Sequence, residues 1–201
     1  MYTLIGTPKA RPFRVLWMME ELGVKYDILP FYPTDKEAMK SYNPTGKVPA
    51  LKVGDDVIID SVAIMQFLAD KHGSLTFGAG TIERAKQDSF TQFICDEIDG
   101  ALWTAARNSF VNPEERRVPA IKDALIWEFE RSIKALEERL GDNEYLTGDT
   151  CTIPDMLLTH CAGWARNSGF PIEADNVRGL IRRMLERDGY KRADAVRNAP
   201  A

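Results

Sequence analysis

The chain has 201 residues, of which 44% are hydrophobic and 28% charged, as is usual for a globular protein of one or two domains. With a net charge of -4, the broad cationic surface with which nucleic-acid-binding proteins contact phosphates is not expected. No stretch approaches the roughly 18 apolar residues of a membrane span, and the N-terminus lacks a secretory leader pattern. We therefore expect a cytoplasmic protein with no nucleic-acid or membrane partner. Three cysteines without a CxxC pair and two distant histidines favour reduced thiols and no metal site.

Residues 1–76 alternate strand-like and helix-like segments in the order β-α-β-α-β-β-α. The strand-like segments are 2–5, 26–32, 48–53 and 57–60, and the helix-like segments are 13–23, 34–42 and 60–73. Gly23 and Gly73 follow two of these helices as stop signals, and Ser61 is the candidate N-cap of the last one. This order predicts an α/β layer that ends in a β-hairpin and a helix.

Residues 74–81 have the composition of a linker, and from residue 82 to residue 201 the pattern is helical. The helical segments are 83–110, 113–143, 152–169 and 176–193. Apolar residues in the second of them recur at the spacing of an amphipathic helix: Ile126, Phe129, Ile133, Leu136 and Leu140. Thr152 and Asp155 have the spacing of a capping box at a helix start. The sequence thus predicts two domains, an α/β domain at 1–76 and an all-α domain at 82–201.

Two motifs in the first domain suggest a binding site for an amino-acid head group. In "NPTGKVPAL" (43–51), Pro49 comes directly before a predicted strand. Either the Val48–Pro49 bond is cis and turns the Val48 N–H and C=O toward an extended ligand, or Pro49 is an ordinary trans edge proline. In "DSVAI" (60–64), Asp60 and Ser61 begin a helix whose positive end can bind a carboxylate while Asp60 accepts from an ammonium group. The alternative for this pair is a plain N-cap.

The element order, "NPTGKVPAL", "DSVAI" and the all-helical second half together resemble the cytosolic glutathione transferases over nearly the whole chain. "RPFRVLWMMEELG" (11–23) is similar to the first helix of that family, and "YLTGDTCTIPDMLLTH" (145–160) is similar to its capping-box segment. The resemblance is to the bacterial-type members of the serine- or cysteine-type subgroup. It implies a thioredoxin-like N-terminal domain, an all-helical C-terminal domain, glutathione as co-substrate without a metal, and a homodimer that serves detoxification.

The resemblance also implies roles for five residues of the first domain. Val48 would form a short backbone ladder with the cysteinyl part of glutathione, and Pro49 would be the cis proline that arranges it. Asp60 and Ser61 would hold the γ-glutamyl group, and Lys47 would reach the glycyl carboxylate. These five residues form the candidate glutathione site.

The second domain is expected to contribute further groups. By resemblance, Asp96 or Gln92 of the neighbouring subunit would approach the γ-glutamyl amine. Trp103 and Arg107, four residues apart on one helix, would border the electrophile pocket. For Trp164 we favour core packing.

Glutathione chemistry requires a thiolate, and an unperturbed thiol has a pKa of about 8.5. The serine-type subgroup would supply a hydroxyl at position 10 to lower that pKa, but this chain has Ala10 there. We expect Arg11, and second to it Thr7, to stabilise the thiolate instead. The alternative for Thr7 is a turn residue whose hydroxyl bonds its own backbone. Arg14 is interpreted as a solvated or carboxylate-paired surface cation.

The expected activity is that of a glutathione transferase, which joins the glutathione sulfur to a small electrophile. One alternative is glutathione-dependent reduction of disulfides or peroxides, which needs the same thiolate. The other is a non-catalytic glutathione-binding or protein-interaction module, and Ala10 is the feature that favours it. The sequence leaves these three open, and it does not name the electrophile.

Overall fold

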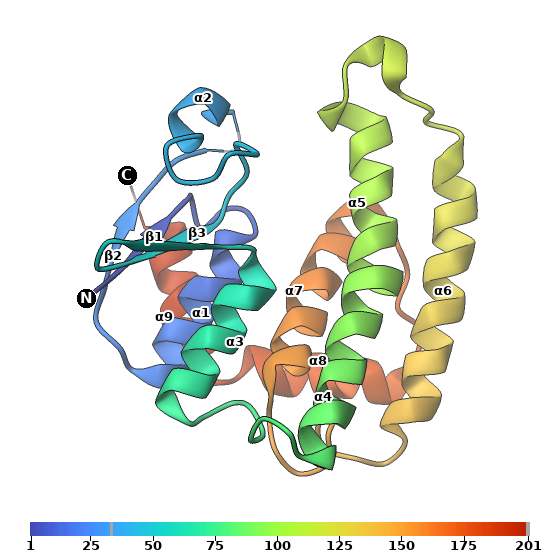
Figure 1. Cartoon of the computed structure of the whole chain (residues 1–201). Coiled ribbons are helices and arrows are strands. Elements are labelled where there is room, and N and C mark those ends of the chain that lie inside the picture. The colour runs from blue at the N-terminus through green and yellow to red at the C-terminus, as the bar shows by residue number, and fades with distance from the viewer. Residues whose placement is uncertain (33, 200–201) are drawn as a thin grey trace. The chain divides into compact units, whose positions relative to one another are not determined.

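The computed structural model describes residues 1–32 and 34–199, so residues 200 and 201 of the expected helical domain lie outside the described residues. The chain divides into two compact units (Figure 1). The first unit joins Met1–Thr76 to the C-terminal segment that begins at Leu185, and the second unit is Phe77–Met184. The C-terminal segment therefore groups with the sheet, although its sequence is helical like the second unit.

The first unit is built on a mixed four-stranded sheet with the strand order β2-β1-β3-β4. The strands are β1 (Tyr2–Ile5), β2 (Tyr26–Leu29), β3 (Ala50–Val53) and β4 (Asp56–Ile59), and the helices are α1 (Pro12–Leu22), α2 (Lys36–Met39) and α3 (Ser61–His72). Strands β1 and β2 are parallel, and the other two pairs are antiparallel. The predicted element order is confirmed. β2 ends at Leu29, earlier than expected, because Pro30 cannot donate to the ladder.

The core of the first unit lies between the sheet and helices α1 and α3. Leu4 of β1, Leu16 of α1 and Leu68 of α3 are fully buried. Gly23 ends α1 in the left-handed conformation, with φ of 63°, and its N–H donates to carbonyls of the last turn. One prediction in this unit is wrong: the N-cap of α3 is Asp60 and not Ser61, because the Asp60 carboxylate accepts the free N–H groups of the first turn.

The expected last helix, 176–193, is two helices, α8 (Asp175–Leu185) and α9 (Asp188–Asn198). The break falls at Arg187, which is extended and donates two hydrogen bonds of 2.8 Å to the Glu21 carboxylate of α1. α9 then packs along α1, where the Tyr190 ring meets the Trp17 ring edge to face at 4.9 Å. Local periodicity missed this break because contacts with a distant helix cause it.

The second unit is helical, as predicted. Its helices and helical turns are α4 (Ile82–Phe93), η1 (Ile94–Asp99), α5 (Gly100–Ala106), η2 (Arg107–Val111), η3 (Glu114–Arg116), α6 (Ile121–Leu140), α7 (Ile153–Ser168) and most of α8. The expected helix 83–110 is one helical run in which η1 and η2 are π-helical turns. α6 begins at Ile121, later than expected, because Pro119 disfavours a helical conformation at the residue before it.

The predicted capping box at the start of α7 is present. The Asp155 carboxylate, fully buried, accepts from the Thr152 and Leu146 N–H groups, each at 2.8 Å. Burial raises the pKa of Asp155 to about 6, against the opposing effect of these hydrogen bonds. The capping box therefore fixes the loop before α7 as well as the helix start.

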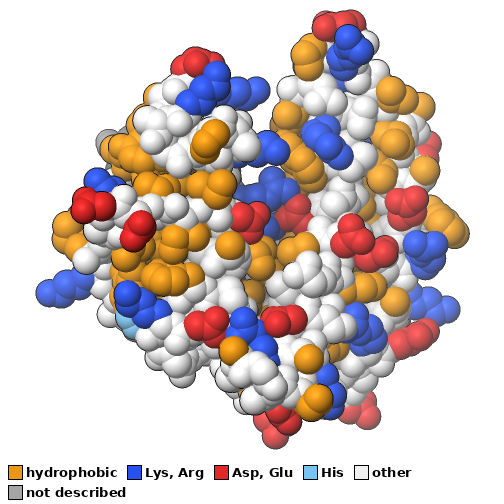
Figure 2. Space-filling model, viewed as in Figure 1, with side chains coloured by type: hydrophobic (Ala, Val, Ile, Leu, Met, Phe, Trp, Pro, Cys, Tyr) orange, Lys and Arg blue, Asp and Glu red, His pale blue; other side chains and the backbone are white. Residues whose placement is uncertain are grey.

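Acidic and basic side chains are interspersed on the face of the molecule that Figure 2 shows, in keeping with the small net charge. Within the described part of the chain, no helix is long and apolar enough to cross a membrane.

Candidate functional site

The end of β1, the start of α1 and the loop before β3 meet at Gly6. Gly6 has φ of 126°, and a Cβ atom there would lie 2.6 Å from Pro12 Cγ and 2.9 Å from Val48 Cβ. Only glycine fits such a conformation and such a close approach. Gly6 thus allows Val48 to lie directly beside the start of α1.

The loop before β3 carries the first part of the candidate site. The Val48–Pro49 bond is cis, which is one of the two conformations that the sequence left open. The Val48 side chain packs against a buried cluster that includes Ile5 and Met39. Its N–H and C=O form no hydrogen bond within residues 1–32 and 34–199. An extended, peptide-like ligand can pair with these two groups.

The neighbouring Lys47 is exposed, and its backbone carbonyl is hydrogen-bonded within the loop. The buried Asn43 side chain donates from Nδ2 to the Lys47 carbonyl oxygen at 2.8 Å. The same Asn43 also accepts from the Thr45 N–H at 3.0 Å. The loop is therefore ordered by its own side chains, while the Lys47 ammonium group extends into solvent.

Asp60 caps α3 in an uncommon backbone conformation, with φ of 74° and ψ of 126°. A positive φ in a residue other than glycine costs on the order of 1–3 kcal/mol and is concentrated at functional sites. Oδ1 accepts from the Val62 and Ala63 N–H groups at 2.8 and 3.2 Å. Oδ2 has no hydrogen-bond partner among the described residues, so it can accept from a ligand ammonium group.

The Ser61 hydroxyl contacts a buried cation, Arg14. Arg14 is 3% exposed, and its Nη1 donates to the Ser61 hydroxyl oxygen at 3.4 Å. The interpretation of Arg14 as a surface cation is therefore wrong, because the inward face of α1 directs its guanidinium toward the start of α3. A hydroxyl that accepts from a guanidinium directs its own proton elsewhere. Ser61 can thus donate to a carboxylate at the positive end of α3, with a fixed positive charge behind it.

The candidates for thiol stabilisation cluster at the turn between β1 and α1. The Thr7 hydroxyl accepts from the Lys9 N–H at 3.3 Å, the geometry of the turn alternative, and Thr7 is 4% exposed. The Ala10 methyl group supplies no donor, and the Ala10 carbonyl accepts from the Phe13 N–H at 3.0 Å. Arg11 is the N-cap residue of α1, is partly exposed, and does not cap the helix with its side chain. The positive end of α1 thus has Arg11 beside it.

In the second unit, Trp103 and Arg107 share a helix face as expected, with the guanidinium 5.9 Å from the centre of the indole ring. Arg107 also donates to the Thr104 hydroxyl at 2.9 Å. Gln92 and Asp96 line a shallow cavity of about 440 Å³ along one helix. Trp164 is half-buried on α7.

Sequence reasoning missed the contributions of Gly6 and Arg14. The signal for Gly6 was a glycine directly between a strand and a proline-containing helix start, a place where backbones approach closely. For Arg14 no local signal separates a buried cation from an exposed one. In the described residues, no group of three or more His, Cys, Asp or Glu side chains gathers where a metal ion would bind.

Family comparisons agree with this geometry. Residues 11–71 match the glutathione S-transferase N-terminal domain, and residues 101–188 match the glutathione S-transferase C-terminal domain. A thioredoxin-like sheet unit with a cis proline before its third strand, together with a helical unit, defines the class of glutathione S-transferase folds. The chain belongs to the glutathione S-transferase superfamily.

Individual relatives include both enzymes and other proteins. The chain is 30% identical over 149 residues to glutathione S-transferase GstA of Escherichia coli O157:H7, which covers 72% of this chain and 71% of that protein. It is 28% identical over 205 residues to elongation factor 1-gamma 1 of Oryza sativa subsp. japonica, covering 96% of this chain and 47% of that protein. The chain thus spans about half the length of the elongation factor relatives, or less.

Among solved structures, the chain is similar to the glutathione transferase URE2P6 of Phanerochaete chrysosporium in complex with oxidized glutathione. The TM-score is 0.82 at 26% identity, and the match covers 98% of this chain and 96% of that chain. The similarity extends over both units of the fold.

Proposed function

We propose that the protein is a glutathione transferase, which binds glutathione in the first unit and transfers its sulfur to a small electrophile. The observation that carries the proposal is the pairing of two binding features in that unit. One is the free backbone edge of Val48 beside the cis proline, and the other is the polar start of α3 at Asp60 and Ser61. Glutathione has a matching peptide backbone and a matching amino-acid end.

In this proposal the γ-glutamyl carboxylate accepts from Ser61, and the γ-glutamyl ammonium donates to Oδ2 of Asp60. The cysteinyl backbone pairs with Val48, and Pro49 maintains the direction of that edge. The glycyl carboxylate lies within reach of the Lys47 ammonium group. Binding at three points fixes the sulfur relative to the start of α1, which reduces the entropy lost on reaching the transition state.

The Arg11 guanidinium, with the Thr7 hydroxyl second, stabilises the thiolate at the positive end of α1. The thiol proton leaves to solvent. The sulfur lone pair then forms a C–S bond with the electrophilic carbon, and the leaving group departs with the electrons of the bond that breaks. A charge-assisted contact with the thiolate is worth about 1.5–3 kcal/mol, or roughly one to two pKa units of the thiol.

The proposal also includes an oligomeric state and a cellular location. The protein acts in the cytoplasm as a homodimer of the bacterial serine- or cysteine-type subgroup. Asp96 or Gln92 of one subunit approaches the γ-glutamyl amine bound to the other. Trp103 and Arg107 border the electrophile pocket, since their shared face combines an aromatic surface with a cation.

The proposal is tested by conjugation of glutathione to a chloro-dinitrobenzene, together with ultraviolet difference spectra of the bound thiolate. Arg11→Ala is expected to weaken the thiolate band and to lower kcat/KM by roughly tenfold to a hundredfold. Lys9→Ala is the matched control, because Lys9 is an exposed cation on the same turn. An unchanged band and turnover in Arg11→Ala would rule out the assigned role of Arg11.

A second candidate is a glutathione-binding or protein-interaction module without turnover. Ala10 favours it, because the expected hydroxyl is missing, and so does the match to elongation factor 1-gamma over nearly the whole chain. Calorimetric binding of glutathione without conjugation would select this candidate. Parallel assays with a small mixed disulfide and a peroxide distinguish glutathione-dependent reduction, which uses the same thiolate.

A further inference from the structure

The proposed function assigns no role to helix α9 (Asp188–Asn198), although this helix belongs to the same unit as the candidate glutathione site. α9 lies almost wholly beyond the segments matched to the family, which are residues 11–71 and 101–188. It nevertheless packs along α1, the helix that carries Arg14 (Figure 1). The contacts between these two helices therefore bear on the site.

α1 presents two different faces to its neighbours. Phe13, Trp17 and Glu21 recur every four residues, so they share the face that meets α9. Arg14 lies about 100° further around the helix, and its Nη1 donates to the Ser61 hydroxyl of α3 at 3.4 Å. α1 is thus packed between α9 and α3, and a movement of α1 away from α3 takes Arg14 away from Ser61.

The last turn of α1 is anchored to the start of α9 through Glu21. The Glu21 side chain is 8% exposed, and it accepts from Arg187 at 2.8 Å and from Nε1 of Trp17 at 2.9 Å. A Cβ atom at Gly189 would lie 2.6 Å from the Glu21 carboxyl carbon. Because two donors hold the Glu21 carboxylate, it cannot move aside for a longer side chain. The register of α9 on α1 is therefore fixed at this end.

The first turn of α1 is held by two side chains of α9. The Tyr190 ring meets the Phe13 ring edge to face at 5.6 Å, and the Arg197 guanidinium lies 4.3 Å from the centre of the same ring. An ion pair with Asp194 keeps Arg197 in place. Phe13 is 2% exposed and directly precedes Arg14. The side chain that α9 holds and the side chain that contacts Ser61 are therefore neighbours.

The contact between Arg14 and Ser61 is sensitive to the position of α1. Its length of 3.4 Å exceeds the usual range of about 2.7–3.2 Å for such hydrogen bonds. A shift of α1 by a fraction of an ångström away from α3 would therefore break it. The packing of α9 on the opposite face of α1 prevents such a shift.

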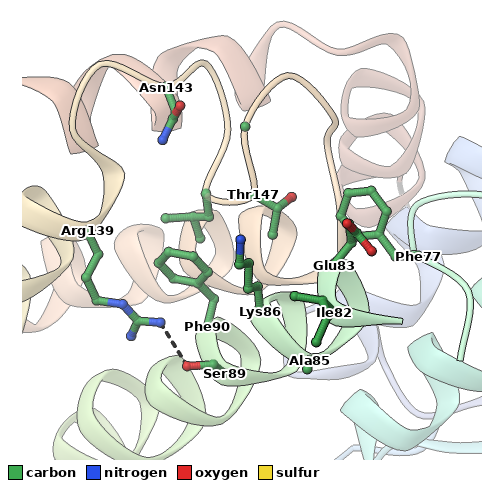
Figure 3. Close-up of a pocket in the computed structure, with 12 residues that line it drawn as sticks. Phe77, Ile82, Glu83, Ala85, Lys86, Ser89, Phe90, Arg139, Asn143 and Thr147 are labelled. Carbon is green, nitrogen blue, oxygen red and sulfur yellow. Dashed lines mark hydrogen bonds between the residues drawn. The ribbon is translucent and has the colours of Figure 1, made fainter. Parts of the chain in front are cut away.

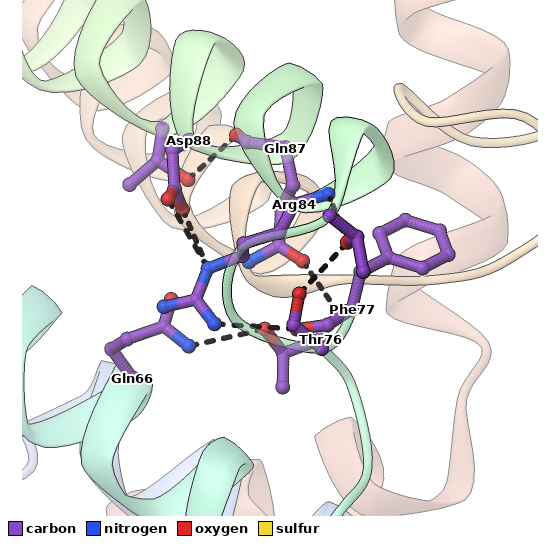
Figure 4. A network of polar contacts seen from close by, with 9 residues as sticks. Gln66, Thr76, Phe77, Arg84, Gln87 and Asp88 are labelled. Atoms are coloured by element: carbon purple, nitrogen blue, oxygen red, sulfur yellow. Dashed lines mark hydrogen bonds and ion pairs between the residues drawn. The ribbon is translucent and has the colours of Figure 1, made fainter.

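The second unit is ordered by contacts of its own. The Phe77 N–H donates at 2.9 Å to Oε1 of the buried Gln87, and Nη1 of Arg84 donates to the Phe77 carbonyl at 3.2 Å (Figure 4). The Leu146 N–H donates to the buried Asp155 carboxylate at 2.8 Å. These five residues all lie within Phe77–Met184, so changes in α9 leave these contacts intact.

The cavity at Arg139, of about 630 Å³, also lies within the second unit (Figure 3). Its lining includes Phe77 and Leu146, together with the cations Lys86 and Arg139. Arg139 donates to the Ser89 hydroxyl at 3.0 Å. Because this cavity involves no residue of the first unit, its cations provide control positions for any variant of α9.

We propose that α9 is a positioning element for the glutathione site, in which Tyr190 and Arg197 hold the first turn of α1 so that Arg14 stays in contact with Ser61. This inference rests on the proposed function, since Ser61 is the group assigned to the γ-glutamyl carboxylate. If α9 only stabilised the fold, its variants would unfold more easily but would bind glutathione normally when folded. A positioning role instead makes the effect of α9 on affinity depend on Arg14.

The test is a double-mutant cycle on the full chain, with the Kd of glutathione measured by calorimetry. Arg197→Gln removes the cation from the Phe13 ring and is expected to raise the Kd by roughly threefold. In an Arg14→Gln background the same change is expected to have no further effect, because the contact that α9 maintains is already absent. Arg197→Lys keeps a cation and Tyr190→Phe keeps the ring, so both are expected to retain a Kd near that of the wild type.

A second readout needs no ligand. NMR of arginine-labelled protein measures how fast the side-chain N–H protons of Arg14 exchange with solvent. Arg197→Gln and Tyr190→Ala are expected to speed this exchange by about threefold to tenfold, because α1 separates from α3 more often. If the wild type does not bind glutathione, the proposed function fails, and the exchange rate still decides the role of α9.

Matched controls come from α9 itself and from the second unit. Lys191 is an exposed cation of α9 whose ion pair is with Glu186, and Lys86 lines the cavity at Arg139. Lys191→Gln and Lys86→Gln are expected to leave both the Kd and the exchange rate unchanged. Thermal unfolding checks each variant. If Tyr190→Ala is poorly folded, Arg197→Gln decides the question, since the Arg197 side chain is 32% exposed.

Two results would overturn the proposal. The first is an unchanged exchange rate of the Arg14 protons in folded Arg197→Gln. The second is a rise in Kd from Arg197→Gln that is equally large in the Arg14→Gln background, which would show that α9 does not act through Arg14.

Discussion

In the first unit, the candidate glutathione site is shaped by backbone conformation, whereas in the second unit the cavity at Arg139 is shaped by side chains that hold a loop. Gly6 and Asp60 have positive φ values, and the Val48–Pro49 bond is cis. The cavity instead depends on the side chains of Gln87 and Asp155. The two sites therefore tolerate different changes. A Cβ atom added at Gly6 of the first site displaces the backbone, whereas the cations that line the cavity of the second unit can be removed one at a time.

The largest effect is expected at Gly6, whose conformation and close contacts shape the first site. Gly6→Ala places a Cβ within 3 Å of both Pro12 and Val48 at a positive φ. We expect a loss of roughly 3 kcal/mol or more in the free energy of unfolding, together with loss of glutathione binding. Urea unfolding and calorimetry measure the two. Gly54→Ala is the control, because Gly54 also has a positive φ but nothing within 4 Å of its Cβ position. Equal losses in both variants would contradict the role of close approach.

The next effect is expected in the second unit, at the buried carboxylate of Asp155. The folded-state pKa of about 6 exceeds the ordinary value of 3.8, so folding favours the protonated carboxyl. The contribution of this group to stability is full below the ordinary pKa and is lost as pH rises through about 6. Two pKa units correspond to about 3 kcal/mol.

Asp155→Asn removes the titrating proton and one oxygen acceptor. Between about pH 4 and about pH 6.5, the free energy of unfolding of the wild type is therefore expected to fall relative to that of Asp155→Asn, because the ordinary and folded-state pKa values differ over this range. Urea unfolding across this range measures the difference. A difference that stays constant with pH would show that Asp155 does not titrate there.

A smaller effect is expected at Arg14, which contacts Ser61 of the first site. Arg14→Gln removes the positive charge behind Ser61, so the KM for glutathione is expected to rise by about tenfold with a smaller change in kcat. Arg14→Lys, which keeps the charge, is expected to restore part of the affinity. A purely structural role would instead lower stability in both variants without a selective change in KM.

The smallest effect, and the one gain, is expected at Ala10. Ala10→Ser supplies the missing hydroxyl and is expected to lower the thiol pKa by about one unit, with up to about a tenfold gain in kcat/KM near neutral pH. The pH dependence of kcat/KM measures the shift. No gain would mean that position 10 does not face the sulfur.

Several features followed from the sequence because their causes are local. The alternation of strand and helix patterns predicted the order of the first unit, and the spacing of Thr152 and Asp155 predicted the capping box. The Asp60–Ser61 pair was identified as a polar helix start, although the N-cap is Asp60 and not Ser61. The functional roles of Lys47, Val48, Asp60 and Ser61 stay predictions.

Other features were decided only by tertiary structure. A cation on α1 has the same local pattern whether it is exposed or buried, and only the packing of α1 against α3 shows that Arg14 contacts Ser61. The break at Arg187 depends on Glu21, 166 residues away in the sequence. Most of the helices and strands, the element order of the first unit and the family could thus be predicted from sequence alone, because they depend on neighbouring residues. Tertiary structure decided which charges are buried and where a cavity opens, because those depend on segments that meet only in the folded chain.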